Sequence, residues 1–187
     1  MYKLKRIFTE DIQAEMHTWV GKELKKYKCD PFTFGNQVYQ IAGLFIGDNS
    51  YKLTNCIEVV DYFGADEDIC FLNLCRCKEE EIVSGLKDEK QIEIYIHRKI
   101  NRIELLKEHQ YLKDLNGKEF SYDFIRGFSI ILEDNYELAF EKIDPFSEEI
   151  AITRGESLID KFQEIDRSED FDSGCQFICE RDKVIIL

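Results

Sequence analysis

Runs of β-branched and aromatic residues, separated by short polar breaks, recur along most of this 187-residue chain and favour a fold dominated by β-sheet. Residues 37–46 and 51–60 are two such runs, and the break at 47–50 between them is typical of a β-hairpin. In the first run apolar residues occupy both alternating sets of positions, as in a strand that is covered on both faces.

Further strands are predicted wherever the same character returns. The segments are 69–77, 91–97, 118–124, 127–133, 137–143, 174–180 and 183–187. Short polar breaks at 134–136 and 181–182 let the chain reverse, so they predict a second and a third hairpin.

Helices are predicted in two or three places. Apolar residues recur at three- and four-residue spacing from Thr9 to Tyr27, and Thr153 with Glu156 has the spacing of a capping box ahead of an apolar stripe that reaches position 165. Asn101 with Glu104 resembles a third cap, although the later pair at 116–117 could instead close a hairpin. The predicted fold class is α+β, with a mainly antiparallel sheet of seven or more strands and two or three packing helices.

Composition favours one globular domain over residues 1–187. Hydrophobic residues make up 44% of the chain, and no repeat or Pro/Gly/Ser-rich linker divides it. No apolar stretch has the length of a membrane span, and the N-terminus lacks the apolar core of a signal peptide. We therefore expect a cytoplasmic protein, in which the seven cysteines are reduced.

The cysteines are interpreted as buried thiols. Alternation in the 69–77 strand places Cys75 and Cys77 on one face, and Cys175 with Cys179 shares a face of another strand. A zinc site would need these four thiols to converge, but their spacing differs from that of knuckle pairs. No metal and no cofactor are expected.

No local motif indicates catalysis. The histidines lack a helical ligand partner, with His17 and His109 in predicted helices and His97 on an exposed strand face. The acidic segment from Asp166 resembles a calcium loop, but its sixth position is Phe171 instead of glycine, so a solvated loop is favoured. No catalytic residue is assigned, and an enzyme is the less favoured class.

Charge is the main functional signal. The net charge is −13, and it is concentrated in residues 29–85, with three basic and ten acidic residues, and 119–187, with seven and eighteen. Such a field repels nucleic acid and anionic membranes and attracts basic proteins. Solubility alone is the competing explanation.

The predicted function is stoichiometric binding of a basic protein through acidic loops with interleaved aromatic residues. The residues assigned to the partner-binding surface are Asp66, Glu67, Asp68, Glu164, Asp166, Glu169, Asp170, Phe171 and Asp172. In its general character, a small acidic protein with cysteine-containing strands and no active-site motif, the chain resembles the immunity proteins that neutralise bacterial toxins such as nucleases. Two alternatives stay open: a hydrolase whose acidic site is built from residues distant in sequence, and a structural or scaffold subunit. The sequence predicts neither the partner nor the oligomeric state.

Overall fold

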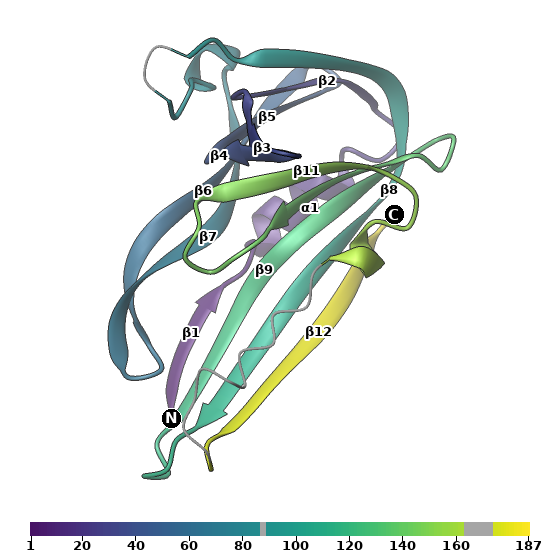
Figure 1. Ribbon diagram of the computed structural model, residues 1–187. Helices are drawn as coiled ribbons and strands as arrows, with labels where there is room; N and C mark the ends of the chain where they lie inside the picture. The colour runs from purple at the N-terminus through teal and green to yellow at the C-terminus, as the bar shows by residue number, and fades with distance from the viewer. Residues whose placement is uncertain (87–88, 163–173) are drawn as a thin grey trace.

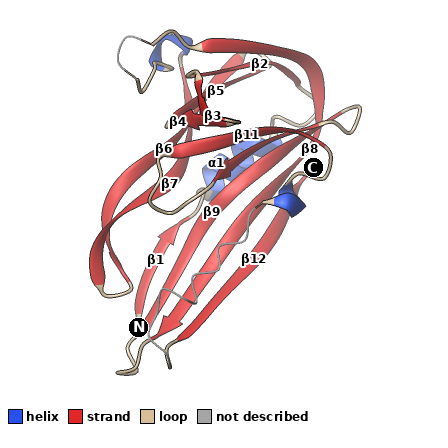
Figure 2. Ribbon diagram, in the orientation of Figure 1, coloured by secondary structure: helices blue, strands red, loops and turns tan. Residues whose placement is uncertain are grey.

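The computed structural model describes residues 1–86, 89–162 and 174–187, and within them the chain forms one strongly curved sheet (Figure 1). Its twelve strands are β1 (Tyr2–Arg6), β2 (Glu23–Cys29), β3 (Phe32–Phe34), β4 (Gln37–Tyr39), β5 (Ile41–Ile46), β6 (Asn49–Tyr62), β7 (Ala65–Cys77), β8 (Ile92–Lys113), β9 (Glu119–Leu132), β10 (Glu137–Lys142), β11 (Glu149–Gly155) and β12 (Gln176–Ile186). The helical elements of these residues are α1 (Glu10–His17) and two 3-10 turns, η1 (Glu79–Glu81) and η2 (Ile159–Lys161). Strand dominates the fold, as Figure 2 shows.

The long strand β8 joins the two halves of the sheet. The strand order is β3-β4-β11-β10-β9-β8-β2-β5-β6-β7, with β1 added to β9 and β12 added to β8. The first part of β8 pairs with β2, and the part from Ile100 onward lies between β9 and β12. All these pairings are antiparallel except that of β1 with β9, which is parallel. In consequence β7 and β12 are edge strands of the two halves.

The predicted α+β class with two or three packing helices is wrong, because the described residues contain a single α-helix of eight residues. Thr9 caps α1 as predicted, since its hydroxyl accepts a hydrogen bond from the Ile12 N–H. The helix stops ten residues early, and the chain turns at Gly21, where φ is +80°. The rest of the predicted helix becomes β2, because β5 and β8 pair with its backbone on both sides.

The other two predicted helices are also strand or turn. Residues 101–112 belong to β8. Asn101, predicted to be a helix cap, is instead the extra residue of a β-bulge in β8. The hairpin that was the alternative at 116–117 is confirmed by the pairing of β8 with β9. Residues 153–165 begin in β11 and continue into η2 within the described part.

Of the three predicted hairpins, two are confirmed. These are the pair β5–β6 and the pair β9–β10. The third is wrong, because 176–186 is one continuous strand along β8. The polar pair at 181–182 that resembled a turn lies mid-strand, where Arg181 forms an ion pair with Glu108 of β8.

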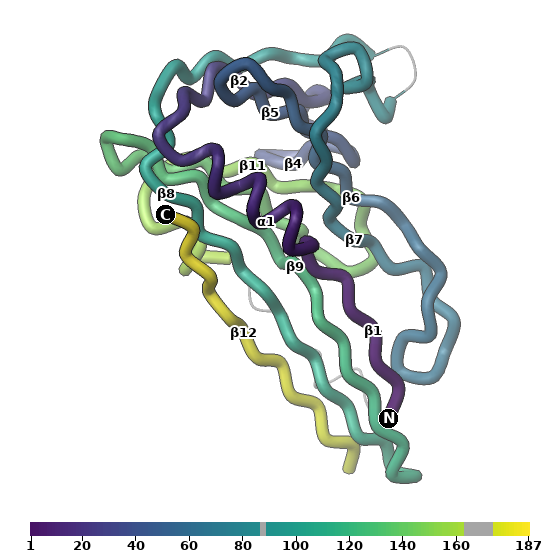
Figure 3. Tube along the Cα trace, turned by 180° about the vertical axis from the view of Figure 1, so that it is seen from behind, coloured from purple at the N-terminus to yellow at the C-terminus, as the bar shows by residue number. Residues whose placement is uncertain are grey.

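The two largest apolar clusters hold the halves of the fold together. The larger one lies between α1 and the sheet and includes the fully buried Trp19, whose ring contacts Tyr51 at a centroid distance of 4.6 Å. Figure 3 shows α1 packed across this face of β8 and β9. The second cluster joins the β6–β7 hairpin to the other half of the sheet; it consists of Val60, Tyr62, Ile69, Phe71, Leu112, Phe120, Tyr122 and Phe124. No helix in the described residues is long and apolar enough to cross a membrane.

Candidate functional surface

The β6–β7 hairpin carries the part of the predicted acidic surface that the structure describes. Its strands pair without interruption from Ser50↔Cys77 to Tyr62↔Ala65, and Phe63 and Gly64 form the turn. Both turn residues have positive φ, +56° and +97°, as a two-residue type I′ turn requires. The hairpin extends well past the β10–β11 connection toward the end of the molecule that carries the N-terminus (Figure 1).

Aromatic packing fixes the end of this hairpin. The Phe63 ring lies 4.7 Å from the Tyr122 ring of β9, and the Phe63 N–H donates a hydrogen bond of 2.7 Å to the Tyr122 hydroxyl. Tyr122 in turn donates to the Asp61 carbonyl at 3.0 Å. Burial raises the pKa of Tyr122, so the hydroxyl keeps the proton that it donates. The backbone at the turn is therefore held in a defined position.

One face of the hairpin combines exposed apolar groups with carboxylates. Cross-strand pairing places Val59 opposite Asp68 and Asp61 opposite Asp66, on the same face as Ile57. The exposed fractions are 69% for Val59 and 45% for Ile57, although both lie within a long strand. We call these five residues the hairpin patch.

The electrostatics of the hairpin patch are unfavourable for the isolated protein. Asp61 and Asp66 lie directly opposite each other, and like charges in that position destabilise a strand pair. Within the described residues no lysine or arginine forms an ion pair with Asp66 or Asp68. By contrast, Glu58 on the opposite face of the hairpin is paired with Arg6 at 2.8 Å. A cationic partner would relieve the repulsion that the fold leaves unbalanced.

The structure separates the predicted surface residues. Asp66 and Asp68 lie in the hairpin patch, whereas Glu67 lies on the opposite face of β7, where its cross-strand neighbour is Val60. The remaining predicted residues, Glu164, Asp166, Glu169, Asp170, Phe171 and Asp172, lie outside the described residues, as does most of the segment that resembled a calcium loop. The sequence did not indicate Ile57, Val59 and Asp61 as surface residues, because alternation groups them on one face without showing that this face is exposed.

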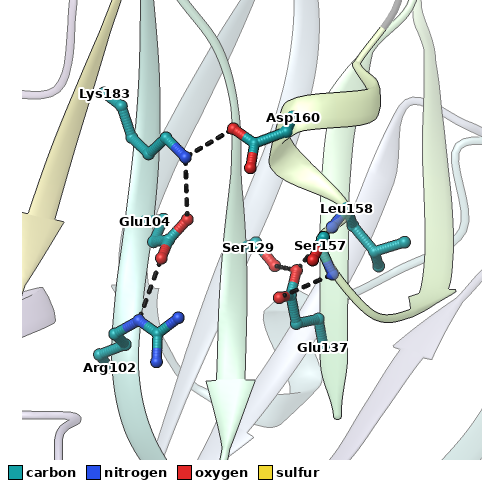
Figure 4. A network of polar contacts seen from close by, with 8 residues as sticks. All are labelled: Arg102, Glu104, Ser129, Glu137, Ser157, Leu158, Asp160 and Lys183. Atoms are coloured by element: carbon teal, nitrogen blue, oxygen red, sulfur yellow. Dashed lines mark hydrogen bonds and ion pairs between the residues drawn. The ribbon is translucent and has the colours of Figure 1, made fainter. Parts of the chain in front are cut away.

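A network of polar contacts holds residues 156–162, which precede the predicted acidic run at 164–172 (Figure 4). Buried Glu137 accepts hydrogen bonds from the Ser129 hydroxyl, at 3.1 Å, and from the Leu158 N–H, at 2.8 Å. Lys183 joins Asp160 of η2, at 2.6 Å, to Glu104 of β8, at 3.7 Å. These contacts fix residues 156–162 on the sheet. Because each carboxylate already has a hydrogen-bond or ion-pair partner, we interpret the network as structural.

A groove lined by residues of β8, β9 and β12 is the site that most resembles an enzyme centre. His109 Nδ1 lies 2.6 Å from Asp123 Oδ1, which orients the imidazole as a catalytic carboxylate would. The other lining residues are Lys5, Ile7, Lys107, Glu108, Glu180, Arg181 and Asp182, and no serine, threonine or cysteine is among them. In the part of the chain that the structure describes, the groove therefore offers the pair no hydroxyl or thiol nucleophile.

The other histidines are peripheral. His97 is exposed on β8 as predicted, with Nδ1 2.7 Å from Glu23, and His17 ends α1. The prediction that His109 lies in a helix is wrong, because it lies in β8.

The cysteines do not converge. Among the described residues no group of three or more histidine, cysteine or acidic side chains could hold a metal ion. Burial raises the pKa of Cys29 and Cys179 to about 12 and that of Cys70 to about 11, so these thiols stay protonated. The prediction of buried thiols holds for Cys29 and Cys70 and is wrong for Cys75, which is exposed.

Comparisons of the chain with protein-family models, with curated proteins and with solved structures find no match. The fold defines a mostly β protein, and the functional argument depends on the geometry of its surfaces.

Proposed function

We propose that this chain is a protein-binding module that engages a basic protein stoichiometrically through the hairpin patch. The observation that carries the proposal is the exposure of Val59 and Ile57 on the same face as Asp66 and Asp68, which form no ion pair with a lysine or arginine of the described residues. An apolar centre with a polar rim is the usual anatomy of a protein interface. The mode of action would be that of an immunity-type inhibitor, which blocks a basic toxin such as a nuclease.

Charge and rigidity support this proposal in different ways. The net charge of −13 attracts a basic partner over a distance and raises the rate of encounter. The aromatic contacts of Phe63 hold the patch in one conformation, so little conformational entropy is lost when a partner binds. The second acidic run, residues 164–172, stays a sequence-based prediction for the same partner.

Site-specific photocrosslinking tests the proposal. A photoreactive amino acid replaces Val59, and the matched control replaces Ile178, which is 49% exposed on β12 at the other edge of the sheet. In the native cell we expect the probe at position 59 to capture one basic protein, and the double change Asp66→Lys and Asp68→Lys to reduce that capture several-fold. Capture that is equal at both positions, or that the charge reversal leaves unchanged, would exclude the hairpin patch as the binding surface.

A hydrolase that uses the oriented His109–Asp123 pair is the second candidate. It predicts turnover by the purified chain that is lost in Asp123→Asn, whereas the binding proposal predicts that this change leaves crosslinking at position 59 intact.

A further inference from the structure

The backbone of β7 offers an unused binding edge beside the hairpin patch. β7 ends the strand order of the sheet, so among the described residues it pairs with β6 on one side only. An edge strand presents N–H and C=O groups with which another strand can pair. Residues 65–68 are all exposed, which leaves this part of the edge accessible.

Contacts at Cys70 show which residues direct their backbone groups outward. The Cys70 N–H donates a hydrogen bond of 2.7 Å to the Pro145 carbonyl, and the Cys70 carbonyl accepts one of 2.8 Å from Lys142 Nζ. Both groups of Cys70 therefore point away from β6. Because this orientation alternates along an antiparallel pair, the N–H and C=O groups of Asp68 and Asp66 point outward as well.

The geometry of the turn independently predicts that the backbone groups of Asp66 and Asp68 point outward. In a two-residue hairpin the residues that flank the turn form a hydrogen-bonded pair, here Tyr62 and Ala65. The next residue, Asp66, then belongs to a pair without mutual hydrogen bonds, and so does Asp68. Neither residue has a backbone hydrogen bond to any described residue on its outer side.

We propose that the partner binds by strand addition: an extended basic segment pairs with the edge of β7 between residues 65 and 69. This inference deepens the proposed function and rests on it. The side chains of Asp66 and Asp68 lie on the same face, so every second residue of the added strand would be placed beside a carboxylate. The outward N–H and C=O groups of Cys70 are already hydrogen-bonded to Pro145 and Lys142, so the added strand must end before Cys70.

Amide hydrogen exchange with a defined probe tests the pairing. The probe is a heptapeptide of alternating lysine and valine, added at low salt to the isotope-labelled full chain. We expect it to slow exchange at the Asp66 and Asp68 amides about tenfold or more, the factor expected when a free amide gains a backbone hydrogen bond of typical strength. The Glu67 amide, which faces β6, is the internal control and should change little.

Two substitutions separate backbone pairing from charge attraction. Asp68→Pro removes an outward N–H, which an edge strand tolerates, whereas Asp68→Ala removes only the carboxylate. We expect the proline variant to bind the peptide about tenfold more weakly than the alanine variant, with both folded by circular dichroism.

Equal binding by the two variants, unchanged exchange at Asp66 and Asp68, or a peptide that does not bind the chain would each overturn strand addition. The crosslinking result at position 59 would decide the proposed function separately, because it requires no backbone pairing.

Discussion

Replacement of the buried Lys142 by methionine should make the stability of this protein respond differently to pH. The Lys142 side chain is 2% exposed, and its ammonium contacts the Cys70 carbonyl and the rings of Phe71 and Phe124. Burial lowers the pKa of Lys142 from 10.5 to about 8. Folding therefore favours the neutral amine at this position, so a charged Lys142 lowers the free energy of unfolding.

The sign and size of the effect follow from proton linkage. Between pH 8 and 10.5 the unfolded chain holds a proton on Lys142 that the folded chain has released, so this residue makes stability rise with pH. A pKa of about 8 in place of 10.5 corresponds to about 3 kcal/mol of destabilisation at pH 7, most of which disappears by pH 10. In Lys142→Met this cost is absent at every pH. The loss of the hydrogen bond to the Cys70 carbonyl costs about 1–3 kcal/mol, but it does so at all pH values.

Urea unfolding of both proteins from pH 7 to pH 10 measures the difference. We expect the stability of the methionine variant relative to the natural chain to fall by about 2–3 kcal/mol over that range. Lys3→Met, which removes an exposed lysine of β1, is the control and should give a difference that does not change with pH. A difference that is flat with pH for Lys142→Met would refute the claim that this lysine is desolvated in the fold.

Three shorter predictions concern the hairpin and the polar network. Asp66→Lys with Asp68→Lys should slow association with the crosslinked partner several-fold and leave thermal unfolding nearly unchanged; unchanged stopped-flow rates would exclude these carboxylates from steering. Phe63→Ala should cost about 2 kcal/mol, because its half-buried ring anchors the turn, and should weaken binding; a chemical denaturation midpoint equal to that of the natural chain would contradict the anchor. Glu137→Gln should cost about 1–3 kcal/mol and speed exchange of the Leu158 amide, and full protection of that amide would show that the contact is dispensable.

The sequence predicted strands better than it predicted helices. Alternating and β-branched runs identified the β5–β6 and β9–β10 hairpins, because those patterns report directly on sheet burial. The predicted helix at 101–112 failed because apolar residues at three- and four-residue spacing also occur in a strand that is buried on both faces and interrupted by a bulge at Asn101. The predicted turn at 181–182 failed for a related reason: Arg181 there forms an ion pair with Glu108 of β8 from within a continuous strand.

The candidate surface was predictable only in part. The acidic run 66–68 was visible, but strand pairing is needed to see that Asp61 joins Asp66 and Asp68 while Glu67 points to the other face. The exposure of Val59 depends on the absence of any described element over that face, which is a tertiary property. The role of the Glu137 carboxylate could not be predicted from the sequence either, because it accepts hydrogen bonds from backbone groups at 157–158, about twenty residues further along the chain.

The claim that the hairpin patch recognises a basic partner is tested most directly by the salt dependence of association. The rate constant would be measured at low and high salt with the partner captured at position 59, for the natural chain and for the variant with lysine substituted at both Asp66 and Asp68. We predict that the association rate constant falls steeply with salt for the natural chain and much less steeply for the variant. Parallel salt dependence in the two proteins would contradict it.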